Sequence, residues 1–351
     1  MKTAHALVGA ALTTLTLAAP SQAQAAETLT VSSWGGPNHG INTIVWPTWK
    51  AWIEDATEGR VTLEVVHDLG PPAAQMALVA DGVADASWIF HGHMAGRFEL
   101  TQLAEFPTFE PFSSETASAA YWRTYQDYLA QASEHRGVDV MAVGVHGPGQ
   151  IFTAEKAETF ADLDGRRLRV GGGVMSDLAS AIGVTGVALP PTGVYESASQ
   201  GVIDGAMLTL EGLRSFRVAE VAPYTLTVDG GFYRGSFAIV VNPYFWDRVS
   251  ADDKAAIESV SGESLSRLFG YMMDVSDERG VEFAKEMGHT FTQASAEDIA
   301  MLKAVNEELI VEWADKVSNG DLDAREALDF FREQLAVADG DDSIATRVVG
   351  E

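Results

Sequence analysis

The sequence predicts an α/β protein of two similar lobes, because strand-like and helical segments alternate over most of its length. A short phrase also occurs twice, as Gly82-Val83-Ala84-Asp85 and as Gly201-Val202-Ile203-Asp204-Gly205, each time between a helical segment and a strand. Such a repeat indicates two lobes of one kind. The first strands are expected at residues 29–33, 61–66 and 84–90, and the first helices at residues 38–57 and 73–80.

The last third of the chain is helical in pattern. Residues 251–287 form a long helical pattern interrupted only by glycines, and further helices are expected at residues 296–317 and 324–335. Ser295, followed three residues later by Asp298, is a typical N-cap for the first of these two. Since these helices have no sheet of their own, we expect them to pack across both lobes.

The N-terminus, residues 1–25, has the pattern of a cleaved secretory signal. Lys2 precedes an apolar run of 14 residues from Ala6 to Ala19, and small residues stand at Ala23 and Ala25. The run is shorter than the roughly 20 residues that cross a bilayer, so no membrane insertion is expected. The chain contains no cysteine, which excludes a lipid anchor on cysteine, disulfides and thiol catalysis.

The charge balance restricts the partners. Lys and Arg number 23 against 50 Asp and Glu, a formal net charge of −27. A chain this acidic repels nucleic acid and anionic membranes, so neither is expected as a partner. An anionic small molecule could bind only in a local positive pocket.

Arg169 is the best candidate for such a pocket. It lies in the segment Leu163-Asp164-Gly165-Arg166-Arg167-Leu168-Arg169-Val170-Gly171-Gly172, where a short strand ends at glycines. Ligands of parallel sheets bind beyond such strand ends, and the planar guanidinium matches a carboxylate with two parallel hydrogen bonds. The alternative is an ordinary surface arginine in a salt bridge.

Aromatic residues follow several of the expected strands. Trp34, Phe90, His91 and Phe232 are the favoured ligand contacts, chosen from a set that also contains Trp88 and Tyr233. Because alternate strand residues point in opposite directions, about half of this set is expected to lie in the core. Glu211 is a further candidate, either as a partner for a ligand ammonium group or as a counter-charge for Arg214 or Arg217.

Two motifs offer alternative functions, one catalytic and one in phosphate binding. His91-Gly92-His93 places two imidazoles on one face of a strand, as in some metal hydrolases, with His67-Asp68 as a further ligand or base. Gly171-Gly172-Gly173 before a helix could hold a phosphate, but the lysine of a phosphate-binding loop is missing. We therefore expect no catalytic residues, no metal and no cofactor, with an exported metal-dependent hydrolase using His91 and His93 as the alternative.

Three pieces of the chain together resemble the extracytoplasmic solute-binding proteins of tripartite ATP-independent periplasmic (TRAP) transporters, the DctP-like family. They are the segment from Leu163 to Val170, then Leu189-Pro190 with Val194-Tyr195, then residues 199–205. The resemblance implies a two-lobed periplasmic-binding-protein fold, type II-like, with a long helix spanning both lobes and a helical C-terminus. It places lobe I at residues 26–148 and about 236–270, lobe II at 149–235 and about 285–320, the spanning helix at 251–287, and the C-terminal helix and tail at 321–351.

The resemblance also implies a function without chemistry. The residue at the position of Arg169 clamps the substrate carboxylate, the lobes close on the ligand, and the protein delivers an organic acid in the periplasm to membrane permease subunits. Some family positions differ here: Pro190-Pro191-Thr192-Gly193 replaces an aromatic and an acidic residue. Gln150 stands for a second arginine and Leu208 for an asparagine, so these two residues are also expected to contact the ligand. These changes favour an acid with an apolar or aromatic body. A sensory receptor is an alternative that the sequence does not separate from transport.

Overall fold

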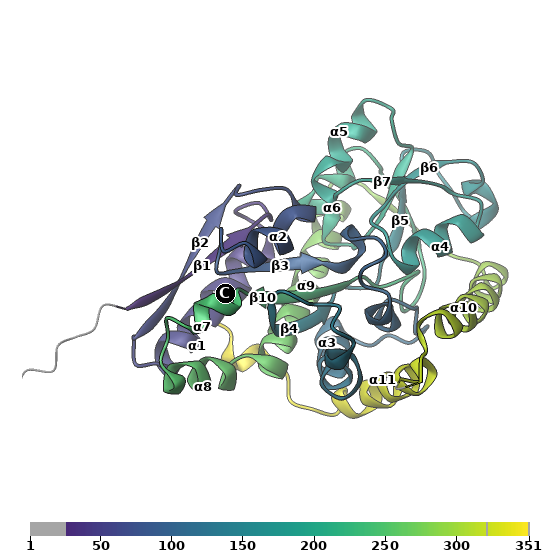
Figure 1. The fold of residues 1–351 in the computed structure, drawn as a ribbon. Helices are drawn as coiled ribbons and strands as arrows, with labels where there is room; N and C mark the ends of the chain where they lie inside the picture. Colours follow the sequence, from purple (N-terminus) through teal and green to yellow (C-terminus); the bar gives the residue numbers. More distant parts are fainter. Residues whose placement is uncertain (1–25, 321, 350–351) are drawn as a thin grey trace, which may run out of the picture.

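Two β-sheets, each with its own helices, form the two lobes in a computed structural model that describes residues 26–320 and 322–349 (Figure 1). The expected signal peptide, residues 1–25, lies outside the described residues. In the part of the chain that is described, no helix is both long enough and apolar enough to cross a membrane.

Lobe I contains the five-stranded sheet, in the order β2-β1-β3-β10-β4. β1 pairs in parallel with β2 and β3, whereas β10 runs antiparallel to β3 and β4. The strands are β1 (Glu27–Ser33), β2 (Val61–His67), β3 (Ala86–Phe90), β4 (Asp139–Val145) and β10 (Ser236–Val241). The helices of this lobe are α1 (Trp46–Ala56), α2 (Gln75–Ala80), α3 (Ser114–Thr124), α7 (Pro243–Trp246) and α8 (Ala251–Ser259).

Lobe II contains the six-stranded sheet, in the order β11-β9-β5-β8-β6-β7. The strands are β5 (Gln150–Thr153), β6 (Arg167–Val170), β7 (Thr185–Ala188), β8 (Gly205–Leu208), β9 (Tyr224–Thr227) and β11 (Thr290–Gln293). Helices α4 (Val174–Ala181), α5 (Val194–Ser199) and α6 (Gly212–Ser215) connect them. β6 pairs in parallel with β7 and β8.

The repeated sequence phrase has the same local structure in both lobes. Asp85 donates its backbone N–H to Thr30 O at 2.9 Å, and its carboxylate accepts the N–H of Thr30 at 2.9 Å. Asp204 makes the same pair of bonds to Arg167, at 2.7 Å and 2.8 Å. In each lobe the aspartate therefore joins its strand to the neighbouring parallel strand.

Two segments cross between the lobes beside each other. The chain leaves lobe I after β4 and returns before β10, and the two crossing segments, residues 146–149 and 233–236, are antiparallel. His146 N–H donates to Gly235 O at 3.0 Å, and Gly149 N–H donates to Tyr233 O at 2.9 Å. These paired segments are one covalent connection between the lobes, and the chain crosses again between α9 and β11 and between α10 and α11.

The expected helix at residues 251–287 is two helices, α8 and α9 (Gly262–Glu286). The break lies at Gly262, whose φ of +59° is a left-handed conformation that glycine adopts readily. α9 packs against α3 and β4 of lobe I and against α6 of lobe II. Gly270 and Gly280 allow close approach, because a Cβ there would lie 2.2 Å from Ser114 O and from Leu210 O, respectively.

The C-terminal helices contact both lobes. α10 (Ala296–Val317) begins at the predicted capping box of Ser295 and Asp298 and packs on α4 of lobe II. α11 (Ala324–Ala338) packs on α3 of lobe I (Figure 1). The chain then returns to α1, where Val349 N–H donates to Thr48 Oγ1 at 3.1 Å.

Candidate functional site

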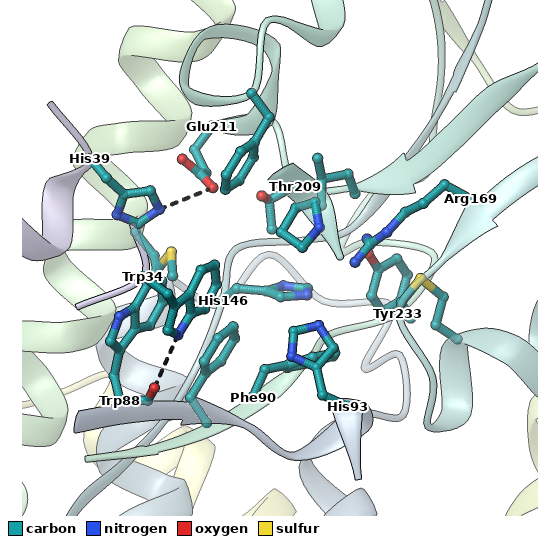
Figure 2. A pocket seen from close by; sticks show the side chains of 16 residues that line it. Trp34, His39, Trp88, Phe90, His93, His146, Arg169, Thr209, Glu211 and Tyr233 are labelled. Carbon is teal, nitrogen blue, oxygen red and sulfur yellow. Dashed lines mark hydrogen bonds and ion pairs between the residues drawn. The ribbon is translucent and has the colours of Figure 1, made fainter. Parts of the chain in front are cut away.

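A partly open cavity lies between the lobes, with about 430 Å³ of space not filled by atoms, part of which is continuous with solvent. We call it the interlobe cavity (Figure 2). Lobe I, the crossing segments and α9 supply Trp34, His39, Trp88, Phe90, His93, His146, Tyr233, Phe237 and Met273. Lobe II supplies Arg169, Met175, Pro191, Leu208, Thr209, Glu211 and Phe216. A ligand held here would contact both lobes at once.

Arg169 lies at one end of the interlobe cavity, beside Tyr233 (Figure 2). Its side chain is fixed from behind, because Nε donates to Leu189 O at 2.8 Å and Nη1 donates to Met207 O at 3.0 Å. Leu189 follows β7 and Met207 belongs to β8, so the strands on both sides of β6 hold the guanidinium in place. Its orientation is therefore set before any ligand arrives.

The guanidinium is buried without a counter-ion. Arg169 is 2% exposed, and no acidic side chain of residues 26–320 and 322–349 lies within ion-pair distance of it. Burial lowers its pKa to about 10, while the nearby Tyr233 acts slightly in the opposite direction. Even so, Arg169 stays charged at neutral pH, and an unpaired buried charge is costly. An anionic ligand would remove that cost.

A wall of stacked aromatic rings lies across the cavity from Arg169, on the side of His39 (Figure 2). The Trp34 and Trp88 rings are parallel within 3° and 3.9 Å apart, and Phe237 packs on the other side of Trp88 at 5.6 Å. Trp34 Nε1 donates to Trp88 O at 3.1 Å, which fixes the outer ring of the stack. Phe90 packs against Phe237 at 5.0 Å. This surface suits a flat apolar or aromatic body.

Several polar atoms on the cavity wall have no hydrogen-bond partner among the described residues. They are Trp88 Nε1, both ring nitrogens of His93, the Tyr233 hydroxyl and Glu211 Oε2. Burial, followed by the charge of Arg169, lowers the pKa of His93 to about 4, so this ring is neutral. Buried polar groups are normally paired, so a group of free ones around one cavity indicates a place for a polar ligand.

Across the cavity from Arg169, His39 of lobe I faces Glu211 of lobe II (Figure 2). His39 Nε2 lies 3.6 Å from Glu211 Oε1, and both side chains are nearly fully buried. Arg214 or Arg217 was the expected counter-charge for Glu211, whereas in the structure Arg217 pairs with Glu220 at 2.7 Å. The His39–Glu211 pair joins the two lobes directly.

The eight residues selected from the sequence divide between the cavity wall and the interior. Arg169, Trp34, Phe90, Leu208 and Glu211 line the interlobe cavity, whereas Gln150, His91 and Phe232 do not. The Gln150 amide is used by the backbone of Val228, which it contacts at 2.8 Å and 3.2 Å. Phe232 is fully buried and packs edge-on against Phe160.

His91 lies in a buried polar chain rather than on the wall. Its Nδ1 contacts Ser236 Oγ at 2.9 Å, and its Nε2 contacts His135 Nε2 at 3.0 Å. Burial, with a smaller effect of His135, lowers its pKa well below the ordinary range. His91 therefore lies in the interior, whereas His93 lines the interlobe cavity. No group of three or more side chains that could hold a metal ion occurs in the described part of the chain.

Part of the cavity wall was not predicted from the sequence: Trp88, Tyr233, His39 and His146 also line the interlobe cavity. Trp88 could have been predicted, because it lies two residues before Phe90 on β3, and residues two apart on a strand face the same side. Phe232 and Tyr233 are adjacent, so their side chains must point to opposite sides of the segment. The sequence does not indicate which of the two sides faces the cavity.

Glu105 makes a second polar link between the lobes. Its Oε1 accepts from Ser236 Oγ at 2.7 Å within lobe I, and its Oε2 accepts from Val174 N–H at 3.0 Å, at the start of α4 in lobe II. Burial raises the pKa of Glu105 to about 7, although both hydrogen bonds act in the opposite direction. The link therefore titrates near neutral pH.

We expect the pH dependence of stability to change in the variant Glu105→Gln. The folded protein keeps the Glu105 proton between the ordinary pKa of 4.5 and about 7, where the unfolded chain loses it. The free energy of unfolding should therefore fall as pH rises through this window, by at most about 3 kcal/mol from this group. Urea unfolding of both proteins between pH 4.5 and 8 measures the difference. The same dependence of the free energy of unfolding on pH in wild type and Glu105→Gln would contradict this assignment. So would an equal change of that dependence in Glu110→Gln, which replaces an exposed glutamate.

Comparison with known proteins gives one consistent picture. Residues 34–316 match the profile of DctP, described as bacterial extracellular solute-binding protein, family 7. A curated relative, the outer membrane transporter protein TsaT of Comamonas testosteroni, is 31% identical over 322 residues, covering 90% of this chain and 94% of the relative.

Solved structures agree with this family. A TRAP periplasmic solute binding protein from Bordetella bronchiseptica, with bound (R)- and (S)-mandelate, matches with a TM-score of 0.85 and 31% identity, covering 88% of this chain and 99% of that one. A TRAP solute binding protein from Rhodoferax ferrireducens with copurified benzoate has a TM-score of 0.82 and 25% identity, with coverage of 89% and 98%. These relatives are transport proteins, so the hydrolase alternative has no support.

Proposed function

The chain belongs to family 7 of the bacterial extracellular solute-binding proteins, the DctP family of TRAP transporters, and we propose that its solute is an aryl carboxylate held by Arg169. It is a binding protein and not an enzyme. The observation that carries the proposal is the buried guanidinium of Arg169, which lines the interlobe cavity without a counter-ion among the described residues.

The geometry around Arg169 supports a carboxylate as the bound group. Nε and Nη1 are already used by backbone carbonyls, so Nη2 and the free edge of Nη1 remain for a ligand. The Tyr233 hydroxyl, which has no hydrogen-bond partner within residues 26–320 and 322–349 and interacts with the charge of Arg169, can donate a further hydrogen bond to the same oxygens. Charge-assisted hydrogen bonds of this kind are about twice as strong as neutral ones.

The aromatic wall supports an aryl body. The stacked pair of Trp34 and Trp88, with Phe90 and Leu208, offers mainly apolar surface beyond the arginine. The two solved relatives named above hold mandelate and benzoate, which are both aryl carboxylates.

Binding is expected to work through closure of the lobes. The carboxylate engages Arg169 of lobe II while the ring packs on Trp34 and Trp88 of lobe I, so only the closed state makes both sets of contacts. Exclusion of water then strengthens the ion pair, because screening decreases with the local dielectric constant. The chain would first be exported and cleaved after Ala25. The TRAP permease subunits in the membrane would then receive the acid from the closed form.

A ligand screen tests the proposed function. In a thermal-shift panel of carboxylic acids at equal concentration, benzoate, mandelate and phenylacetate are expected to raise the melting temperature most. At a concentration 100 times the dissociation constant, the stabilisation is about 2.7 kcal/mol. Sugar acids and short aliphatic acids serve as the comparison set. A response limited to polyhydroxylated acids would overturn the assignment of an aryl solute.

A further inference from the structure

We propose that Glu211 accepts a hydrogen bond from a hydroxyl group on the ligand, remote from its carboxylate, so that the preferred solutes are hydroxyaryl carboxylates. This inference rests on the proposed function, because Arg169 must hold the carboxylate for the other end of the ligand to reach Glu211. It concerns the opposite end of the interlobe cavity and a residue that makes no contact with Arg169.

The carboxylate of Glu211 has one oxygen engaged and one free. Oε1 faces His39 Nε2 at 3.6 Å, whereas Oε2 is buried and makes no hydrogen bond of normal geometry among the described residues, although the Ser215 hydroxyl is near enough to the carboxylate to lower its pKa. The Glu211 side chain is 4% exposed, so water of the bulk solvent does not satisfy it. A buried carboxylate oxygen without a donor is costly, and a ligand donor would remove that cost.

The hydrogen bonds of His39 indicate that the Glu211 carboxylate acts as a hydrogen-bond acceptor. His39 Nδ1 accepts the N–H of Ile41 at 3.1 Å, so the ring proton lies on Nε2, which faces the carboxylate. Burial tends to raise the pKa of Glu211, but the interactions with His39, Ser215 and His146 outweigh it and lower the pKa. Glu211 is therefore ionised at neutral pH and can only accept hydrogen bonds.

The position of the carboxylate in the cavity determines which end of the ligand it meets. Figure 2 shows Glu211 and His39 at one end of the interlobe cavity and Arg169 with Tyr233 at the other, with Thr209 between them. The backbone of Glu211 is held by Asp277 of α9, whose Oδ1 accepts its N–H at 2.7 Å. The acceptor is thus fixed in place before binding.

These charges orient the ligand. A carboxylate is attracted to the Arg169 end and repelled from the Glu211 end, so an acid enters with one polarity only. A hydroxyl on the far side of the ring then meets Oε2 as a donor. By the same reasoning, an aryl dicarboxylate such as terephthalate would place its second charge at Glu211 and should be rejected.

Titration calorimetry with benzoate, 3-hydroxybenzoate and 4-hydroxybenzoate tests the inference. For wild type, at least one hydroxybenzoate should bind about tenfold or more tightly than benzoate, as expected for a hydrogen bond to a charged group. In Glu211→Leu this ratio should fall to about one, and in Glu211→Gln, which keeps a neutral acceptor, it should take an intermediate value. The exposed variant Glu196→Gln, in the same lobe, should keep the wild-type ratio.

The ratio, rather than the affinity, is the decisive quantity. Loss of the His39–Glu211 pair weakens contact between the lobes and should reduce affinity for all three acids equally. Equal affinities for benzoate and both hydroxybenzoates in wild type, an unchanged ratio in Glu211→Leu, or binding of terephthalate as tightly as benzoate would each overturn the inference while leaving the proposed function intact. If none of these acids binds wild type, the proposed function itself fails.

Discussion

Replacing Arg169 with methionine is expected to weaken the binding of aryl carboxylates strongly while leaving the protein folded. Methionine fills a similar volume but offers no donor, so the ligand carboxylate would enter a buried cavity without a partner. Removing one member of a buried charge pair costs about 2–5 kcal/mol, which corresponds to a loss of affinity of roughly thirtyfold to several thousandfold. Calorimetry with the acid identified by the ligand screen measures this loss.

Arg167 offers a matched control on the same strand. It is exposed, lies outside the interlobe cavity and pairs with Asp204 at 2.6 Å. Arg167→Met removes the same charge from the same strand and should leave the affinity within about twofold. Wild-type affinity in Arg169→Met, with circular dichroism showing an intact fold, would remove the physical basis of the proposed function.

Replacing Trp34 with alanine is expected to have the second largest effect. The change removes the outer ring of the Trp34–Trp88 stack and opens the cavity wall on the side of lobe I. Loss of buried apolar area together with ring stacking is worth about 2 kcal/mol, or roughly thirtyfold in affinity for benzoate. Cyclohexanecarboxylate, which buries similar area without an aromatic face, should lose less.

Trp52 provides the control for this variant. Its indole lies away from the interlobe cavity, where Nε1 donates to Arg347 O at 3.0 Å. Trp52→Ala should change stability but not the preference for benzoate over cyclohexanecarboxylate. An unchanged preference in Trp34→Ala would show that the aromatic stack does not contact the ligand.

The α/β architecture was predictable because it depends on local patterns. Strand alternation, helix caps such as Ser295 and the repeated Gly-x-x-Asp phrase each report on a few neighbouring residues, and each has the expected structure. The break at Gly262 was wrongly assigned to the interior of a helix. A glycine within a helical pattern gives little indication of whether it will adopt a left-handed conformation, which here depends on the packing of α8 and α9.

The cavity wall was predictable only in part, because it depends on contacts between distant segments. Arg169 could be selected from a strand end and its glycines alone. Gln150 could not be excluded, since its use by the Val228 backbone requires the register of β5 beside β9. The pairing of His39 with Glu211 joins residues far apart in the sequence, and no local signal connects them.

The two close approaches of α9 limit how the molecule can open. Gly270 leaves no room between the helix and the backbone of Ser114 in lobe I, and Gly280 leaves none beside Leu210 in lobe II. With one fixed contact point in each half, the helix cannot slide along either of them. Opening must therefore bend α9 between residues 270 and 280 or separate one of the two contacts. Any side chain added at Gly280 would act as a wedge next to Glu211 and would hold the entrance ajar.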